Sequence, residues 1–233
     1  MPRPKRGYKR SIPTQELARD YKLFAIACEG SVREREYFSI FQHISSRIAV
    51  DIIGDVDEET GEIKITTKSS PKQVLERAVR YVENEGILAS DELWLVLDID
   101  RWPIDHLRAL AEECSNHPNW HIALSNPCFE VWLYFHMRKD IDEREILSSS
   151  DCKHILAELS DGGYHPCEYI LHVKDAIANA QSVDENPEYW KPEYKRTKVY
   201  LLMRNLMEFV SVKEFNAFID NLPLLRRQGI EQL

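Results

Sequence analysis

Two apolar segments that each lead into acidic residues constrain the fold of this chain more than any other feature. Residues 23–28 are apolar and lead into Glu29, and residues 93–97 are apolar and lead into Asp98 and Asp100. Runs of this length with β-branched and aromatic residues, followed by helical patterns, are typical of buried strands in a parallel sheet. Because ligands of such sheets bind outside the carboxyl ends of the strands, we expect these acids to lie at a binding edge.

Three carboxylates at one edge of a sheet would repel one another unless a cation lay between them. Asp98 and Asp100 are two residues apart, so in an extended segment their side chains point the same way. Oxygen-rich clusters suit magnesium or manganese. We therefore expect Glu29, Asp98 and Asp100 to bind Mg²⁺ or Mn²⁺. The alternative is that acids just after a strand serve as helix caps or solvated loop residues.

Hydrophobic periodicity along the chain predicts an α/β fold. Segments with helical spacing separate four expected strands, and this alternation predicts a doubly wound, mostly parallel sheet of about four strands flanked by helices. From Asp151 onward the pattern is helical, apart from a loop at residues 183–195, and residues 63–66 are expected to form a short edge strand. The four strands are expected at residues 23–28, 48–54, 93–97 and 121–125.

Length and composition predict one substantial core. The chain has 233 residues and is 43% hydrophobic, which is enough to fold without disulfides. Its five cysteines are odd in number and form no C-x-x-C pair, so neither a disulfide framework nor a zinc site is indicated. We expect a basic arm at residues 1–20, an α/β domain at residues 21–140 and a helical region at residues 141–233 packed on it. This last region can be a substrate platform, the contact surface of a homo-oligomer, or core cover.

The distribution of charge predicts a nucleic-acid partner, and the lack of a long apolar run predicts no membrane span. Although the formal net charge is −9, the first ten residues carry five basic residues and no acid. A basic arm can neutralise phosphates, and the alternative is a solubilising terminus. No apolar run approaches a membrane span, and no apolar stretch resembles a secretory signal, so we expect a cytoplasmic protein. The five basic residues are Arg3, Lys5, Arg6, Lys9 and Arg10.

Further polar residues near the expected strand ends are candidates for the same site. Arg33, Arg35 and Arg101 can bind substrate phosphates, because guanidinium groups bind phosphate in a bidentate manner. Asn126 can orient a ligand or begin the turn after its strand. Two more acids can hold a second metal ion, Glu34 and Glu130. For Glu130 the alternative is a carboxylate stabilised at a helix N-terminus by the helix dipole.

Several of these motifs resemble the RloB-like family, which is linked to bacterial restriction and phage-defence loci. The resemblance covers most of residues 21–210, and the block S-N-P-C-F-E-x-W at residues 125–132 is its most specific element. Arg33 departs from the pattern, since a small hydroxyl residue is expected before Glu34. The matching segments are residues 28–30, Glu34, residues 37–38, 94–100 and 125–133, and residues 197–199 with the apolar helix after them.

The RloB-like family is similar to Toprim domains, the metal-binding catalytic folds of topoisomerases, bacterial primases and certain nucleases. The resemblance implies a Toprim-like domain at residues 21–140, in which Glu29 matches the Toprim glutamate and Asp98 and Asp100 match its D-x-D motif. It implies a metal-dependent nuclease that hydrolyses RNA or DNA in phage defence, with these three acids as catalytic residues. The alternatives are a non-catalytic nucleic-acid-binding or regulatory partner of a defence system and a primase-like nucleotidyl transferase.

Overall fold

The sheet at the centre of the fold has the strand order β2-β1-β5-β6-β7. The structure, a computed structural model, describes residues 20–30, 32–56, 63–64, 70–141, 148–159 and 164–227. Four strands run parallel: β1 (Lys22–Cys28), β2 (Ile48–Ile52), β5 (Glu92–Asp98) and β6 (Trp120–Asn126). The short β7 (Arg196–Thr197) pairs antiparallel with β6, and β3 (Asp55–Val56) and β4 (Ile63–Lys64) form a separate pair. The carboxyl ends of β1, β5 and β6 therefore meet at one edge.

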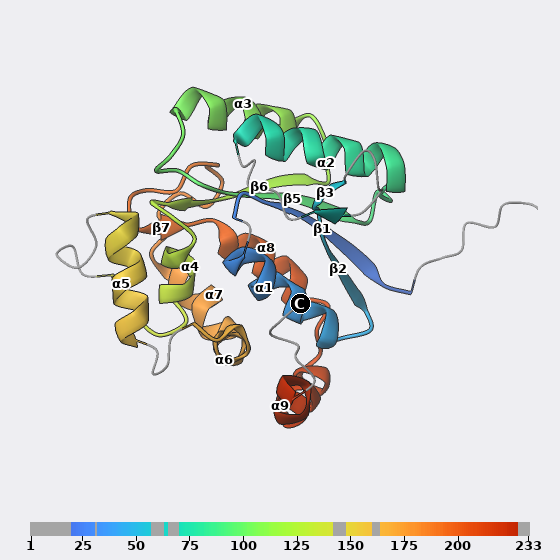
Figure 1. Cartoon of the computed structure of the whole chain (residues 1–233), viewed down its shortest axis with the longest axis vertical. Helices are drawn as coiled ribbons and strands as arrows, with labels where there is room; N and C mark the ends of the chain where they lie inside the picture. Colours follow the sequence, from blue (N-terminus) through green and yellow to red (C-terminus); the bar gives the residue numbers. More distant parts are fainter. Residues whose placement is uncertain are drawn as a thin grey trace, which may run out of the picture.

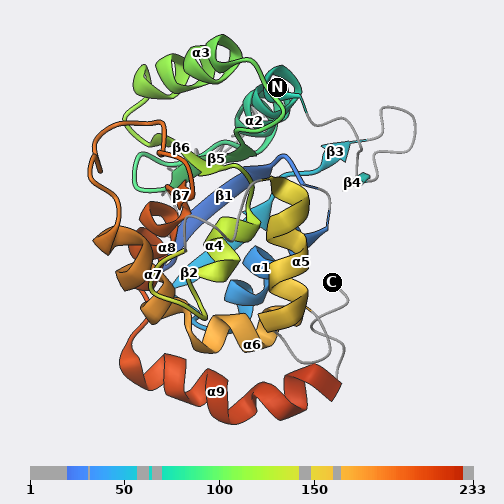
Figure 2. The same ribbon diagram turned by 90° about the vertical axis from the view of Figure 1, so that its left-hand side faces the viewer.

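Helices cover both faces of this sheet (Figure 1). On one face lie α2 (Pro71–Glu85) and α3 (Ile104–Ser115), and against the other lie α1 (Arg33–Ser39) and α8 (Val199–Met207). Figure 2 shows α9 (Val212–Arg227) running across the end of the molecule that lies farthest from α3. The remaining helical elements are the 3₁₀ helix η1 (Ile40–His43), α4 (Glu130–Tyr134), α5 (Ser149–Leu159), α6 (Pro166–Leu171) and α7 (Val173–Ser182).

Burial on both faces of the sheet explains the continuous apolar runs in the sequence. Successive side chains of a strand point to opposite faces. In β1, Phe24 and Ile26 join the core cluster that includes α1 and α8, whereas Ala25 and Ala27 join the cluster under α2 and α3. Because the side chains on both faces are buried, the strand shows no alternation of apolar and polar residues.

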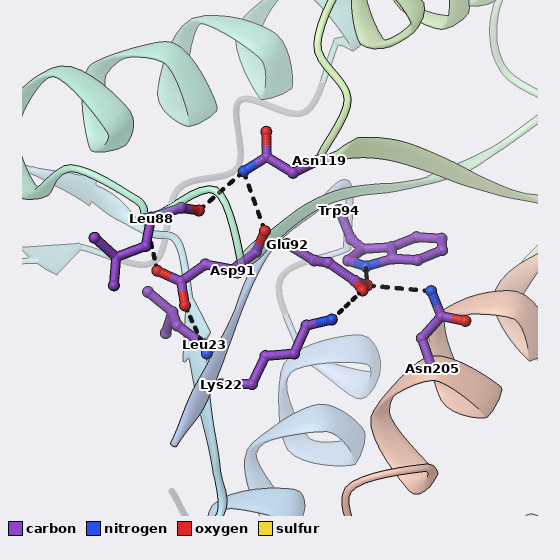
Figure 3. Close-up of polar contacts among 8 residues, drawn as sticks. All are labelled: Lys22, Leu23, Leu88, Asp91, Glu92, Trp94, Asn119 and Asn205. Atoms are coloured by element: carbon purple, nitrogen blue, oxygen red, sulfur yellow. Dashed lines mark hydrogen bonds and ion pairs between the residues drawn. The ribbon is translucent and has the colours of Figure 1, made fainter. Parts of the chain in front are cut away.

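A polar network at the amino edge of the sheet fixes β1 against β5 (Figure 3). The Glu92 carboxylate accepts hydrogen bonds from Lys22 Nζ at 2.6 Å, Trp94 Nε1 at 2.8 Å and Asn205 Nδ2 at 3.3 Å. Burial raises the pKa of Glu92, but these three donors outweigh it and leave the pKa below its usual value. Beside it, Asp91 accepts hydrogen bonds from the backbone N–H groups of Leu23 and Leu88.

The predicted α/β class, with a mostly parallel sheet flanked by helices in a Rossmann-like arrangement, is confirmed. The expected strands are all present, but residues 63–64 pair with β3 instead of forming an edge of the main sheet. The helical pattern after Glu29 is interrupted, because α1 ends at Ser39 and the chain continues as η1 before β2 begins at Ile48. The apolar segment at residues 129–137 forms only the short α4, followed by turns.

The basic arm lies almost entirely outside the described residues, which begin at residue 20. The predicted boundary between an α/β domain ending at residue 140 and a helical region beginning at residue 141 stays a prediction. One core cluster contains side chains from both sides of it, from Phe24 to Leu222. Within the described ranges, no helix has the length and apolar character needed to cross a membrane.

Candidate metal centre

The ends of β1 and β5 bring Glu29 and Asp98 into direct contact. The two strands are parallel neighbours, with Cys28 opposite Val96. The backbone N–H of Glu29 donates to Val96 O at 2.8 Å, and the backbone N–H of Asp98 donates to Glu29 Oε2 at 3.0 Å. The Glu29 side chain therefore crosses from the end of its own strand to the end of the next.

Glu29 is buried, and one of its two carboxylate oxygens lacks a hydrogen bond. Its Oε1 makes none with the residues that the structure describes, and the nearest cation is Arg101, whose Nη1 lies 3.9 Å away. Burial raises the pKa of Glu29, and the amide of Asp98 and the nearby indole of Trp102 offset this only in part. The site thus contains a buried acceptor atom with unused capacity.

Asp98 is held by the S-N-P-C-F-E block. Its Oδ1 accepts a hydrogen bond from the backbone N–H of Phe129 at 2.8 Å, and the backbone N–H groups of Ile99 and Asp100 both donate to Pro127 O at 3.2 Å. Burial raises the pKa of Asp98 well above its usual value, and the neighbouring carboxylates, with Glu34 first, raise it further. The block therefore shapes the loop in which the D-x-D motif lies.

Glu34 is a second buried acid, and it lies directly over Gly30. A Cβ atom at residue 30 would be 1.9 Å from Glu34 Oε2, so a glycine leaves room for this carboxylate. The pKa of Glu34 is raised to about 7, chiefly by burial and then by the neighbouring carboxylates of Glu130 and Glu29. From the sequence, Glu34 could be predicted only as an additional acid. Its closeness to Asp98 depends on how α1 packs, which no local pattern shows.

Glu130 and Asp100 complete the group from α4 and from the loop after β5. Glu130 is buried, and its Oε1 accepts a hydrogen bond from Arg33 Nη1 at 2.5 Å. Asp100 is exposed and accepts a hydrogen bond from the Ser149 hydroxyl on α5. Because β5 ends at Asp98, the extended geometry expected for the D-x-D motif does not continue to Asp100. The two aspartates therefore lie in different environments.

The chemistry of these side chains fits an oxygen-ligated divalent cation. Within the described ranges, no three His, Cys, Asp or Glu side chains are arranged as a ready-made metal site, and protein donors occupy one oxygen of each of four acids. All the potential ligands are nevertheless carboxylates, which Mg²⁺ and Mn²⁺ prefer. The pKa values of Glu29, Glu34 and Asp98 are raised mainly by burial, and a cation bound beside the unpaired Oε1 of Glu29 would favour their charged forms.

The four candidate substrate-binding residues do not share one location. Arg33 and Arg101 contact Glu130 and Glu29 respectively, and the Arg101 side chain is 59% exposed. Arg35 lies half-buried on α1, and no ion pair joins it to these acids within the part of the chain that is described. Asn126 donates to Pro192 O at 3.2 Å, so its amide binds the loop before β7 instead of the acids.

Two polar residues near the acids were not expected from the sequence. Arg77 on α2 is buried and donates to Cys28 O at 2.7 Å, next to Glu29. Its sequence signal is an arginine three residues after Val74, within the apolar stripe of α2. Ser149 belongs to a serine run at the start of α5 that is typical of a helix N-terminus, but no local pattern connects it with Asp100, 49 residues away.

Comparison with known proteins identifies one family. A family model described as RloB-like protein matches residues 24–206. The match includes the whole acidic group and the strands that position it. Neither the curated proteins nor the solved structures contain a match to this chain.

Proposed function

The chain belongs to the RloB-like protein family, and on this premise we propose that it is a Mg²⁺- or Mn²⁺-dependent nuclease that hydrolyses phosphodiester bonds of RNA or DNA in bacterial phage defence. The observation that carries the proposal is the group of carboxylates at the ends of β1 and β5, with an unpaired buried oxygen on Glu29. Grouping buried acids costs stability, so the group favours a role that needs their charge.

The acids and arginines of the site, apart from Glu34, have the following roles in this proposal. Glu29, Asp98 and Asp100 would hold the metal, and Glu130 is a further ligand. When bound, the metal polarises a phosphoryl oxygen and lowers the pKa of the attacking water. The exposed guanidinium of Arg101 binds a substrate phosphate and positions it beside Glu29. Arg33 neutralises Glu130 in the resting site and can bind a second phosphate.

Cleavage assays on the full chain test this proposal. We expect labelled RNA or DNA to be cut with Mg²⁺ or Mn²⁺ and to remain intact with a chelator. Asp98→Asn and Glu29→Gln keep the shape of each side chain but remove its charge, and each should reduce the cleavage rate by at least about 100-fold. Glu112→Gln, which changes an exposed acid on α3, is the matched control and should cleave like the wild type.

The same assay separates the alternatives. Nucleic-acid binding without cleavage under any metal would favour a non-catalytic partner of a defence system, and the Arg33–Glu130 ion pair, which neutralises one acid of the group, is compatible with that function. A requirement for nucleoside triphosphates would favour a primase-like transferase. Equal cleavage by the wild type and by Asp98→Asn would contradict the proposed site.

A further inference from the structure

A cavity of about 320 Å³ lies at the free edge of β6, away from the acids. We call it the edge cavity. It lies between β6, the C-terminal part of α3, the loop before β7 and the start of α8, and its volume is in the range of small-molecule sites. Ile122, which lines it, precedes the end of β6 by four residues, or about 13 Å along the strand. Its aromatic lining residues are Trp94, Trp120, His121, Tyr189 and Trp190.

Unpaired backbone groups of β6 face this cavity. Asn119 O and Ser125 O accept hydrogen bonds from the β5 side, whereas Leu124 O accepts one from Lys198 N at 2.7 Å on the opposite side. By the alternation of a strand, the N–H and C=O of Ile122 point to the same side as Leu124 O. Because β7 pairs only with Ser125 and Asn126, these two groups of Ile122 make no hydrogen bond with any described residue.

Aromatic rings line the cavity from the sheet and from the loop before β7. On the sheet side, the Trp94 ring is fixed by its hydrogen bond to Glu92 (Figure 3) and lies 4.6 Å from the His121 ring, centroid to centroid. On the loop side, the Tyr189 and Trp190 rings are 5.7 Å apart. Aromatic walls bind planar ring systems by stacking.

The charges at the edge cavity disfavour an anionic group inside it. Lys198 is the one cation among the described lining residues, and its ammonium group is buried and bound to Asp184 Oδ2 at 2.6 Å and Asn186 O at 2.7 Å. Burial lowers the pKa of His121, which favours the neutral form of its ring. An added peptide strand also fits poorly, because among residues 121–124 only Ile122 has an outward-facing N–H and C=O that are both without a described partner; the outward-facing C=O of Leu124 is already bound by Lys198 N.

We propose that the edge cavity binds the base of a purine nucleoside or nucleotide, whose adjacent acceptor and donor pair with the N–H and C=O of Ile122. The base lies among the aromatic rings, and the sugar and any phosphate extend toward solvent. The inference does not depend on the acidic group, because the cavity and the acids use different residues. It gives this chain a nucleotide-sensing site separate from its proposed catalytic site.

Calorimetric titration of the full chain in the presence of a chelator tests the proposal. Adenosine should bind, ribose should not, and purine riboside, which lacks the exocyclic amino group, should bind about 3- to 10-fold more weakly. Trp190→Ala should lower the affinity for adenosine by roughly tenfold, and Trp190→Phe should restore most of it. Tyr194→Ala removes an exposed aromatic ring of the same loop outside the cavity and serves as the matched control.

Three results would overturn the inference. These are the absence of saturable nucleoside binding up to millimolar concentrations, equal affinities of Trp190→Ala and the wild type, and equal affinities of purine riboside and adenosine. Asp98→Asn should keep the wild-type affinity for adenosine even where it abolishes cleavage. Absence of cleavage by the wild type with adenosine binding retained would therefore count against the nuclease proposal alone, and absence of adenosine binding would count against the edge cavity alone.

Discussion

At the scale of single residues, the carboxyl group of Glu34 links the acidic group to the stability of the fold. Its pKa is raised from the usual 4.5 to about 7, chiefly by burial and then by Glu130 and Glu29. The folded state therefore binds the proton more tightly than the unfolded state. Protonation of Glu34 favours folding below about pH 4.5, and this contribution is lost as the pH rises through about 7.

This pKa shift predicts how stability depends on pH. The free energy of unfolding of the metal-free wild type should fall between pH 5 and pH 8, with Glu34 accounting for roughly 3 kcal/mol at most. Glu34→Gln should flatten the profile and be more stable than the wild type at pH 8. Urea unfolding at both pH values measures this, with Glu112→Gln as the exposed control. A Glu34→Gln profile parallel to that of the wild type would contradict the prediction.

At the scale of elements, the register of β1 against β5 depends on the buried Asp91. This carboxylate accepts the backbone N–H groups of Leu23 at 3.1 Å and Leu88 at 2.7 Å. Asp91→Ala leaves both donors without this acceptor, so we expect a loss of about 2–5 kcal/mol in the free energy of unfolding. Urea unfolding measures it, and Glu112→Ala should change stability by less than about 0.5 kcal/mol. A small loss for Asp91→Ala would show that the register has other supports.

The sequence predicted those elements whose signal is local. The parallel strands are continuous apolar runs because both faces of the sheet are covered. Since parallel strands have their carboxyl ends at the same edge, the sequence was enough to predict that Glu29 and Asp98 lie there. The short extent of α4 was not predictable, because the apolar run at residues 129–137 contains no signal for the end of a helix, and the two-residue β7 has too few residues for a period. The contacts of Asn126 with Pro192 and of Asp100 with Ser149 join segments 66 and 49 residues apart, so they depend on tertiary packing.

At the scale of the whole molecule, cation binding should appear as added stability, since a ligand of the folded state alone shifts unfolding by mass action. At about ten times its dissociation constant, Mn²⁺ or Mg²⁺ should raise the melting temperature of the wild type by roughly 3–5 °C. Asp98→Asn should melt above the metal-free wild type at pH 8, because it removes a charge whose burial and acidic neighbours are unfavourable, but its melting temperature should not respond to the metal. Scanning fluorimetry at constant ionic strength separates specific binding of the cation from salt screening. Glu112→Gln should respond to the cation like the wild type. If Asp98→Asn gained as much as the wild type from the cation, the metal would bind elsewhere, and the carboxylates at the strand ends would need another explanation.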